Sequence, residues 1–301
     1  MITIVFMGSP EFGVHSLEGL AQEYRVAGVV SQPDRAAGRG QGLKPPPVKA
    51  LALTLGLPLI QPQRLSRPEA MQQLRQWAPD LVVVAAFGQI LRPEVLALPP
   101  HGCVNVHASL LPRWRGAAPI QAAILAGDAQ AGVTIMKMDA GVDTGAMIAQ
   151  RAIPIEPNDT GGSLSEKLAR LGAELLMETL PDYLGGRLLL QPQDESLATR
   201  APILKKEDGR LDFSRPAVEL ARRVRAFQPW PGAFFDWGGS TLKVQRAHPA
   251  AGQAPAGARR VHEGSPAVGT GEGLLVLDEV QPAGKKPMPG NAFLAGARAW
   301  G

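Results

Sequence analysis

The feature that most constrains the fold of this chain is a series of short apolar runs separated by longer amphipathic segments. The runs lie at residues 2–7, 26–30, 81–86 and 103–106, and helix-like segments lie at 13–24, 67–77 and 118–127. A strand that is apolar at nearly every position is buried on both faces, which is typical of a parallel sheet covered by helices. The pattern therefore predicts a doubly wound α/β fold around a mainly parallel sheet.

The same alternation continues toward residue 188 and then stops. We expect two more strands at 133–138 and 147–155, and a helix at 163–184 whose opening letters SLSE match a capping box. Beyond residue 188 the sequence is polar and irregular. It then offers one helical stretch and several strand-like pieces between Gly- and Pro-rich breaks, which predicts a small β-rich domain.

Chain length supports a division into two domains, because single cores stop growing at roughly 250 to 300 residues. We predict a first domain at residues 1–188, a linker at 189–206, and a smaller C-terminal β-rich domain at 207–301. Residues 205–301 hold 14 Lys and Arg against 9 Asp and Glu, whereas the rest of the chain is nearly neutral. A basic C-terminal third fits either a solvated surface or an anionic partner.

The cysteine content and the apolar segments of the sequence limit the cellular compartments that fit this chain. A single cysteine, Cys103, excludes an internal disulfide or a multi-thiolate metal site and fits a reducing environment. The first letters, MITIVFMGSPEF, lack a basic leader, and no apolar stretch approaches the roughly 20 residues that a membrane helix needs. We expect a cytoplasmic protein that does not enter a membrane.

The letters GSPEFG after the first apolar run invite comparison with a dinucleotide-binding turn. That turn needs G-x-G-x-x-G, whereas here Gly8 and Gly13 have Pro10 between them. Asp34 lies within a long loop and not where an acidic residue would bind the ribose. The sequence therefore argues against NAD binding, and it contains no P-loop motif.

Three polar residues fall where predicted strands end. Asn105 and His107 stand two apart on an extended segment, so their side chains point the same way, and ligands bind beyond the carboxyl ends of such strands. Asp143 follows a strand between Gly141 and Gly145, which permit a tight reversal. An amide can donate to an oxyanion, a His can exchange a proton, and the carboxylate can orient that His. The alternative is an Asn and an Asp that only form turns beside a structural His.

Covalent and metal-assisted chemistry fit the sequence less well. Cys103 shares a strand face with His107, but four extended residues place the two about 13 Å apart, too far for an activating hydrogen bond. Ser109 lacks the G-x-S-x-G context of a strained nucleophile. The five histidines show no metal-ligand spacing. We expect Cys103 to pack in the core and expect no metal.

Several motifs along nearly the whole chain resemble the folate-dependent formyltransferase family. The most specific are NVHASLLPRWRGAAPIQAAILAGD and GVTIMKMDAGVDTG, joined by GSPEFG, SQPDRAAGRG, PPPVK, FQPWPGAFF and QPAGKKPM. The C-terminal third agrees only patchily, with AGQAPAGARRVHEGSPA divergent. The resemblance implies a Rossmann-like formyltransferase domain followed by a smaller C-terminal β-barrel of the OB type. It also implies 10-formyltetrahydrofolate as donor and the α-amino group of methionine esterified to initiator tRNA as acceptor. Such a chain would serve translation initiation, and we expect it to act as a monomer.

The resemblance also implies roles for particular residues. The family's catalytic set is matched by Asn105, His107 and Asp143. Its folate-binding segments are matched by Ser109, Leu110, Leu111, Pro112, Phe87 and Gly88. Contacts to the tRNA are expected from Arg35, Arg39, Lys44, Arg222, Arg223 and Lys285, with Arg39 matching the key residue of a loop that enters the acceptor stem.

The implied reaction is attack by the amine on the formyl carbon, with the oxyanion held by Asn105 and protonated His107. Either His107 or a bound water would collect the amine's proton. Two other functions compete with this one: formylation of a small amine such as glycinamide ribonucleotide or an amino sugar nucleotide, and non-catalytic RNA binding by the C-terminal domain alone. A small-amine enzyme would leave the basic C-terminal domain and the basic loop at 34–49 unexplained.

Overall fold

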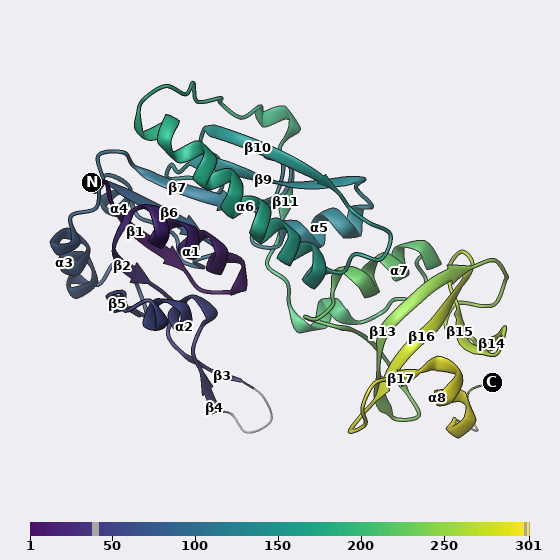
Figure 1. Cartoon of the computed structure of the whole chain (residues 1–301). Coiled ribbons are helices and arrows are strands. Elements are labelled where there is room, and N and C mark those ends of the chain that lie inside the picture. Colours follow the sequence, from purple (N-terminus) through teal and green to yellow (C-terminus); the bar gives the residue numbers. More distant parts are fainter. Residues whose placement is uncertain (38–41, 298–299, 301) are drawn as a thin grey trace. The chain divides into compact units, whose positions relative to one another are not determined.

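The computed structural model describes residues 1–37, 42–297 and 300 of the 301-residue chain (Figure 1). Contacts divide the chain into two compact units. The first contains residues 1–119, 130–154 and 165–201, and the second contains 120–129, 155–164 and 202–301. The first part of the predicted linker, residues 189–201, thus lies within the first unit.

The first unit is built on seven strands in the order β10-β9-β7-β6-β1-β2-β5. Their bounds are β1 Thr3–Gly8, β2 Arg25–Val30, β5 Leu59–Ile60, β6 Leu81–Ala85, β7 Cys103–His107, β9 Gln130–Lys137 and β10 Met147–Pro154. Neighbours from β7 through β6, β1 and β2 to β5 are parallel, whereas β9 is antiparallel to β7 and β10 to β9. The predicted mainly parallel sheet is confirmed, with an antiparallel edge.

Helices cover both faces of this sheet (Figure 1). Their bounds are α1 Val14–Glu23, α2 Pro47–Thr54, α3 Pro68–Trp77, α4 Pro93–Leu96 and α6 Gly161–Leu184. Helix α5, Pro119–Ala126, lies almost wholly in the second unit. On one face Gly172 of α6 lies against Val106. On the other, Leu74 of α3 packs with Val5 and Val84 in a buried cluster. Apolar side chains on both sides of each strand explain why the runs in the sequence do not alternate with polar residues.

Helix starts follow their local chemistry. Helices α2, α3 and α4 begin at a proline, whose φ is already helical and whose missing N–H would be unpaired there. Helix α6 begins two residues before the predicted start. Thr160 and Ser163 exchange backbone-to-side-chain hydrogen bonds, Ser163 N to Thr160 Oγ1 at 3.1 Å and Thr160 N to Ser163 Oγ at 3.0 Å. Ser163 therefore lies inside the first turn, and the SLSE prediction of the cap was wrong.

The long loop after β2 contains two short strands. Strands β3 (Arg35–Ala37) and β4 (Gly42–Lys44) form a small antiparallel hairpin, and α2 follows from Pro47. Arg39, the residue predicted to contact the acceptor stem, lies outside the described residues. The remaining short elements of the first unit are the 3-10 helices η1 Glu11–Gly13 and η2 Glu195–Leu197 and the paired strands β8 Arg115–Gly116 and β11 Arg200–Ala201.

The second unit is an antiparallel sheet in the order β12-β13-β16-β15-β14, with β17 paired to β16. Its elements are η3 Lys206–Gly209, α7 Ala217–Ala226, β12 Ala233–Trp237, β13 Ser240–Ala250, β14 Arg259–His262, β15 Ser265–Gly269, β16 Leu274–Pro282, β17 Met288–Pro289 and α8 Gly290–Gly296. Phe293 of α8 packs edge-on against Trp237 and Trp300 within the core. The predicted β-rich domain is confirmed, although β14 and β15 were not predicted, because Gly and Pro obscure their pattern.

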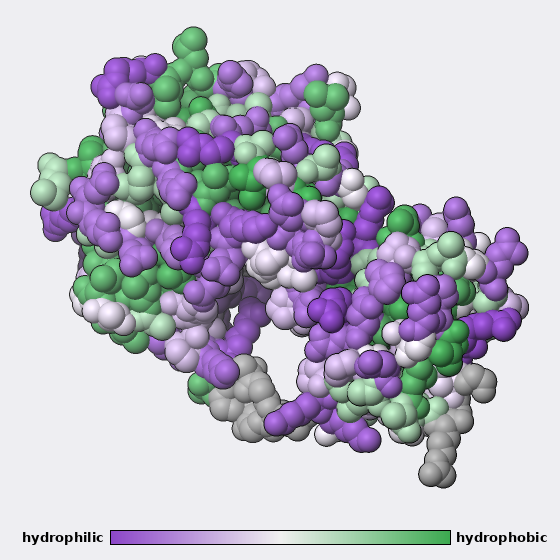
Figure 2. All heavy atoms as spheres, turned by 45° about the vertical axis from the view of Figure 1, so that its right-hand side comes forward, coloured by the Kyte–Doolittle hydropathy of each residue, from purple (hydrophilic) through white to green (hydrophobic). Residues whose placement is uncertain are grey.

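No helix in the described part of the chain is long and apolar enough to cross a membrane. Cys103 is buried on β7, its Sγ lies 3.7 Å from the Val95 carbonyl, and burial raises the pKa of the thiol to about 12. The predicted packing role of Cys103 is confirmed. On the face shown in Figure 2, hydrophilic side chains predominate over both units, with apolar patches between them.

Candidate active site

Strand β7 carries the first two polar residues of the candidate active site. Asn105 and His107 share one face of the strand, opposite Met136 and Thr134 of β9, while Val106 faces α6. Both polar side chains are buried, with exposed fractions of 8% and 6%. Buried polar groups need partners, so their surroundings decide what they can do.

The loop after β9 brings Asp143 to this strand end. Asp143 has φ of +54°, a left-handed conformation that few non-glycine residues adopt. The flanking glycines serve by their size and not by a positive φ. A Cβ at Gly145 would lie 1.8 Å from the Lys137 carbonyl oxygen, and one at Gly141 would lie 2.0 Å from Thr144 Oγ1. The sequence explanation of this turn, glycine freedom, is thus replaced by close packing around a strained aspartate.

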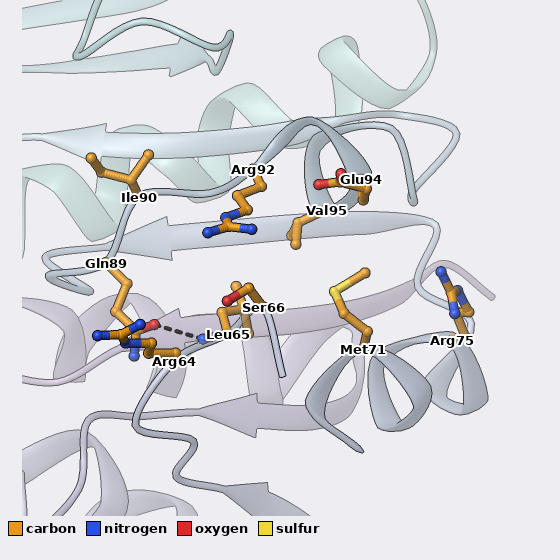
Figure 3. Close-up of a pocket in the computed structure, with 10 residues that line it drawn as sticks. All are labelled: Arg64, Leu65, Ser66, Met71, Arg75, Gln89, Ile90, Arg92, Glu94 and Val95. Carbon is orange, nitrogen blue, oxygen red and sulfur yellow. Dashed lines mark hydrogen bonds between the residues drawn. The ribbon is translucent and has the colours of Figure 1, made fainter. Parts of the chain in front are cut away.

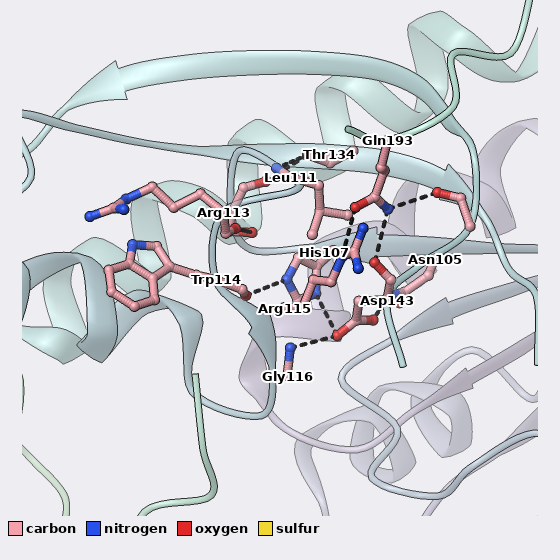
Figure 4. A network of polar contacts seen from close by, with 12 residues as sticks. Asn105, His107, Leu111, Arg113, Trp114, Arg115, Gly116, Thr134, Asp143 and Gln193 are labelled. Atoms are coloured by element: carbon pink, nitrogen blue, oxygen red, sulfur yellow. Dashed lines mark hydrogen bonds and ion pairs between the residues drawn. The ribbon is translucent and has the colours of Figure 1, made fainter. Parts of the chain in front are cut away.

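The Asp143 carboxylate is the centre of a polar network (Figure 4). Its Oδ2 accepts a hydrogen bond from Gly116 N at 2.8 Å and lies 3.6 Å from His107 Nδ1. Its Oδ1 lies 3.5 Å from Asn105 Nδ2. The structure therefore brings Asn105, His107 and Asp143 together at the carboxyl end of a buried strand.

The second nitrogen of His107 faces the loop after β7. His107 Nε2 lies 3.1 Å from the carbonyl oxygen of Trp114, a residue with φ of +62°. A carbonyl only accepts, so a hydrogen bond there requires a proton on Nε2, and the Asp143 carboxylate favours a proton on Nδ1. Both ring nitrogens of His107 therefore face oxygen acceptors, which fix the orientation of the imidazole.

A second layer of polar residues, which the sequence analysis missed, fixes the Asp143 loop. Gln193 Nε2 donates to the carbonyl oxygens of Asp143 and Gly145, at 2.9 and 2.8 Å, while its Oε1 accepts from Arg115 Nε at 2.9 Å. Arg115 is buried and forms a two-pronged ion pair with Glu195 at 2.9 and 2.8 Å. The available signal was a long polar stretch without obvious elements inside a compact domain.

The predicted folate loop is braced from β9 and β10. Thr134 Oγ1 donates to Ser109 O and accepts from Leu111 N at 3.1 Å, and Gln150 Nε2 donates to Leu111 O at 2.8 Å. The Ser109 hydroxyl donates to Arg113 O at 2.7 Å. The loop therefore presents backbone and the half-buried Leu110 and Pro112 more than a free hydroxyl.

The loop after β6 borders a cavity of about 600 Å³ (Figure 3). Phe87 packs in the buried cluster beneath this loop, and Gly88, with φ of +80°, is exposed. The cavity is lined by Arg64, Leu65, Ser66, Met71, Arg75, Gln89, Ile90, Arg92, Glu94 and Val95. Its lining includes none of the three catalytic candidates, so this cavity does not contain the network of Figure 4.

The residues predicted to contact RNA are dispersed. On the hairpin, Arg35 pairs directly with Lys44 and both are exposed, a like-charged cross-strand pair that costs stability unless an anion relieves it. In the second unit, Arg222 lines a cavity of about 620 Å³ together with Arg225 and Arg246.

Two further predicted RNA contacts lie elsewhere in the second unit. Arg223 donates to the Asp208 carbonyl at 3.0 Å and lies over the Phe227 ring. Lys285 lies in the exposed turn between β16 and β17. The structure therefore does not gather Arg222, Arg223 and Lys285 into one site. Within the described ranges, no group of three or more His, Cys, Asp or Glu side chains could hold a metal.

Comparison with known proteins assigns this geometry to a family. The sequence profile of the formyl transferase family matches residues 2–180, and that of the formyl transferase C-terminal domain matches residues 203–298. The chain belongs to the formyl transferase family. The first formyl transferase profile spans Asn105, His107 and Asp143.

Relatives and solved structures in the formyl transferase family extend the comparison. The methionyl-tRNA formyltransferase of Myxococcus xanthus is 52% identical over 97% of this chain and 94% of its own. The sugar 3N-formyl transferase WlaRD, solved in the presence of dTDP and 5-N-formyl-THF, gives a TM-score of 0.69 at 18% identity over 95% of this chain and 99% of its own. A methionyl-tRNA formyltransferase from Clostridium thermocellum gives 0.58 at 17% identity over 82% and 93%. At such identities the structures show the fold alone.

Proposed function

We propose that this chain transfers the formyl group of 10-formyltetrahydrofolate to the α-amino group of methionyl initiator tRNA, for translation initiation. The observation that carries the proposal is the Asn105, His107 and Asp143 network in a formyl transferase chain. Methionyl-tRNA formyltransferases match this chain at 52% and 49% identity over nearly its whole length. A cytoplasmic monomer is part of the same proposal.

The amine attacks the formyl carbon directly. A free α-amino group titrates near 7.7 to 8.0, and esterification of the carboxyl lowers that value, so the amine is largely neutral at cellular pH. The new C–N bond converts the formyl carbonyl into an oxyanion, which Asn105 Nδ2 and the protonated His107 stabilise. Asp143 holds both donors in place.

Collapse of the intermediate breaks the bond between the formyl carbon and N10 of the folate. The electron pair of that bond stays on N10, which takes a proton, and tetrahydrofolate leaves. The amine loses one proton, so the proton count balances through His107 or a bound water. No step requires a metal or a redox change.

The donor would lie between the two loops at the carboxyl ends of β6 and β7. Leu110 and Pro112 offer apolar surface on one side, with Leu111 buried, and the loop at Phe87 and Gly88 lies on the other. Folate carries a glutamate with two carboxylates. Arg64 and Arg92, in the cavity bordered by the loop after β6, form no ion pair within the described part of the chain, and they would attract that tail.

The acceptor would be held by charge at two places. The hairpin presents Arg35, Lys44 and, in its sequence, Arg39. The cavity with Arg222, Arg225 and Arg246 in the second unit would meet phosphates and add sequence-independent affinity. Residues 1–188 would then supply the chemistry and 207–301 most of the remaining RNA contact.

A formyl-transfer assay with purified protein and 10-formyltetrahydrofolate tests the proposal. Charged initiator methionyl-tRNA should be formylated with a kcat/KM at least about a thousandfold above that for glycinamide ribonucleotide or an amino sugar nucleotide. Preference for either small amine would contradict the proposal. Binding of the tRNA without formyl transfer would support the non-catalytic alternative instead.

A further inference from the structure

The root of the β3–β4 hairpin is held by a half-buried carboxylate. Asp34 directly precedes β3, and Lys49 Nζ of α2 contacts both carboxylate oxygens at 2.9 and 2.7 Å. Gln61, after β5, donates from Nε2 to Asp34 Oδ1 at 2.8 Å. These hydrogen bonds, first from Gln61 and then from Lys49, hold the pKa of Asp34 below its usual range. Asp34 is thus an ionised anchor for the hairpin.

Further hydrogen bonds connect Asp34 to the loop after β6, which borders the proposed folate site. Gln61 Nε2 also donates to Gln32 O at 2.8 Å. Gln32 in turn donates from Nε2 to Phe87 O at 3.2 Å, and its backbone N donates to Ser9 Oγ at 3.0 Å. Hydrogen bonds therefore run from the hairpin root, through two glutamines, to the loop after β6.

Gln89, in the loop after β6, bonds in turn to the segment after β5 that carries Gln61. Gln89 Oε1 accepts from Leu65 N at 2.8 Å, and its Nε2 donates to Pro62 O at 3.1 Å. The loops after β2, β5 and β6 are therefore cross-linked into a closed ring. We call Gln32, Asp34, Lys49, Gln61 and Gln89 the loop ring.

None of the loop-ring side chains forms a hydrogen bond with Asn105, His107 or Asp143 among the described contacts. The ring therefore acts on placement and not on the reacting atoms. Networks of satisfied, half-buried hydrogen bonds are stiff, because each broken contact leaves a polar group without its partner. A stiff ring fixes the separation between the hairpin root and the loop at Phe87.

We propose that Lys49, Gln61 and Gln32 are positioning residues that lock the root of the basic hairpin to the donor-side loop. The ring sets the aminoacyl end of the RNA at a constant distance from the formyl donor. This inference rests on the proposed function, since the hairpin and the Phe87 loop matter only if they hold the acceptor and the donor.

Lys49→Met tests the hairpin side of the ring, with Lys49→Arg as the charge-retaining control. Methionine methyl ester serves as a second acceptor, because it has the reacting amine but is too small to reach the hairpin. We expect Lys49→Met to lower kcat/KM for charged tRNA about tenfold and to leave the methyl ester rate and the folate KM within about twofold. Lys49→Arg should restore most of the tRNA activity. A role in folding alone would reduce both acceptors equally and would overturn the proposal.

Gln61→Met tests the connection between the two sides without unpairing a charge, since Lys49 still holds Asp34. The matched control is Gln63→Met, two residues away, whose side chain bonds only to the exposed Arg67 among the described contacts. Gln61→Met should raise the KM for both the tRNA and the folate about threefold to tenfold, and Gln63→Met should change neither.

The outcomes of these tests separate two failures. Wild-type kcat/KM for tRNA in both Lys49→Met and Gln61→Met would overturn the loop ring while leaving the formyltransferase function intact. Absence of tRNA formylation by the wild-type protein would instead contradict the proposed function.

Discussion

The active site and the basic hairpin both follow carboxyl ends of strands in one sheet, yet they are held in opposite ways. Asp143 is fixed by Gly116, and its loop by Gln193, inside a buried network. The hairpin is anchored at Asp34 and carries exposed, mutually repelling charges at Arg35 and Lys44. Bond formation requires donors fixed within a fraction of an ångström, whereas phosphate attraction tolerates movement. Rigidity is therefore needed at the active site and at the hairpin root, and not at the exposed charges that the hairpin carries.

The largest expected effect comes from removing the charge at the rigid end. In Asp143→Asn one oxygen becomes an NH₂ group, which must face either the Gly116 N–H or the Asn105 amide, donor against donor. We expect kcat below about a tenth of wild type, a barrier increase above ~1.4 kcal/mol, with folate affinity nearly unchanged. Alanine at Asn105 or His107 should be similarly severe. A higher residual kcat in steady-state assays would contradict the assigned role.

A smaller loss of kcat should follow from weakening the residues that support the Asp143 loop. Glu195→Gln weakens the partner of the buried Arg115, which orients Gln193 against the Asp143 loop. We expect kcat to fall about tenfold. The control is Glu178→Gln, which likewise weakens a two-pronged partner of an arginine, here the half-buried Arg151. If both variants lose activity equally, the loss is not specific to the Arg115 support.

The ion pair between Arg115 and Glu195 also predicts how the melting temperature depends on pH. Hydrogen bonds from Arg115 hold the pKa of Glu195 below its usual range. A lowered folded pKa stabilises the protein above the unfolded value of about 4.3, and that stabilisation is lost as pH falls through the folded pKa. The Tm of wild type should therefore exceed that of Glu195→Gln near pH 7, and the two should converge below about pH 4. A constant difference across this range would contradict the ionised pair.

A change in the basic hairpin should alter the binding of the tRNA acceptor and not that of the folate donor. Arg39→Ala removes one of the cations near the proposed acceptor, so we expect the KM for charged tRNA to rise about fivefold. Folate affinity should not change, because the donor-side loop is untouched. Wild-type kcat/KM for tRNA in this variant would make the hairpin a bystander.

A finer contrast lies between neighbouring arginines of the second unit. Arg222→Gln should reduce the slope of log K for tRNA against log salt by about 1, as loss of one phosphate contact does. Arg223→Gln should instead lower Tm, because Arg223 supports the Asp208 carbonyl. Lys285→Gln should act as Arg222→Gln does. Equal salt slopes in Arg222→Gln and wild type would remove Arg222 from the RNA surface.

The smallest effect is expected at Cys103. Cys103→Ala should keep near wild-type turnover and lose about 1 to 2 kcal/mol of unfolding free energy, measured by denaturant titration. A formyl group trapped on Cys103 in mass spectrometry would revive a covalent route.

The sequence predicted that Asn105, His107 and Asp143 come together. A period of two fixes Asn105 and His107 on one face of β7, whereas Asp143 follows the antiparallel β9 and reaches them through its loop. Gln193 and Glu195 were missed because their contacts with Arg115 span 78 and 80 residues and no periodicity marks them. The start of α6 shifted because Thr160 supplies a better cap than Ser163. Strands β14 and β15 were hidden because the sequence around them is rich in Gly and Pro, and cross-strand partners, not local propensity, hold them extended.

The burial of the Cys103 thiol affects how readily oxidants modify the protein. Oxidants and electrophiles react with the thiolate, and with a pKa of about 12 Cys103 is ionised in roughly one molecule in 10⁵ at pH 7. Sulfenic acid formation, glutathione capping and disulfide exchange all begin from that ionised form. The chain's one cysteine is therefore a poor target in oxidative stress, and a redox signal would have no thiol switch through which to silence the enzyme.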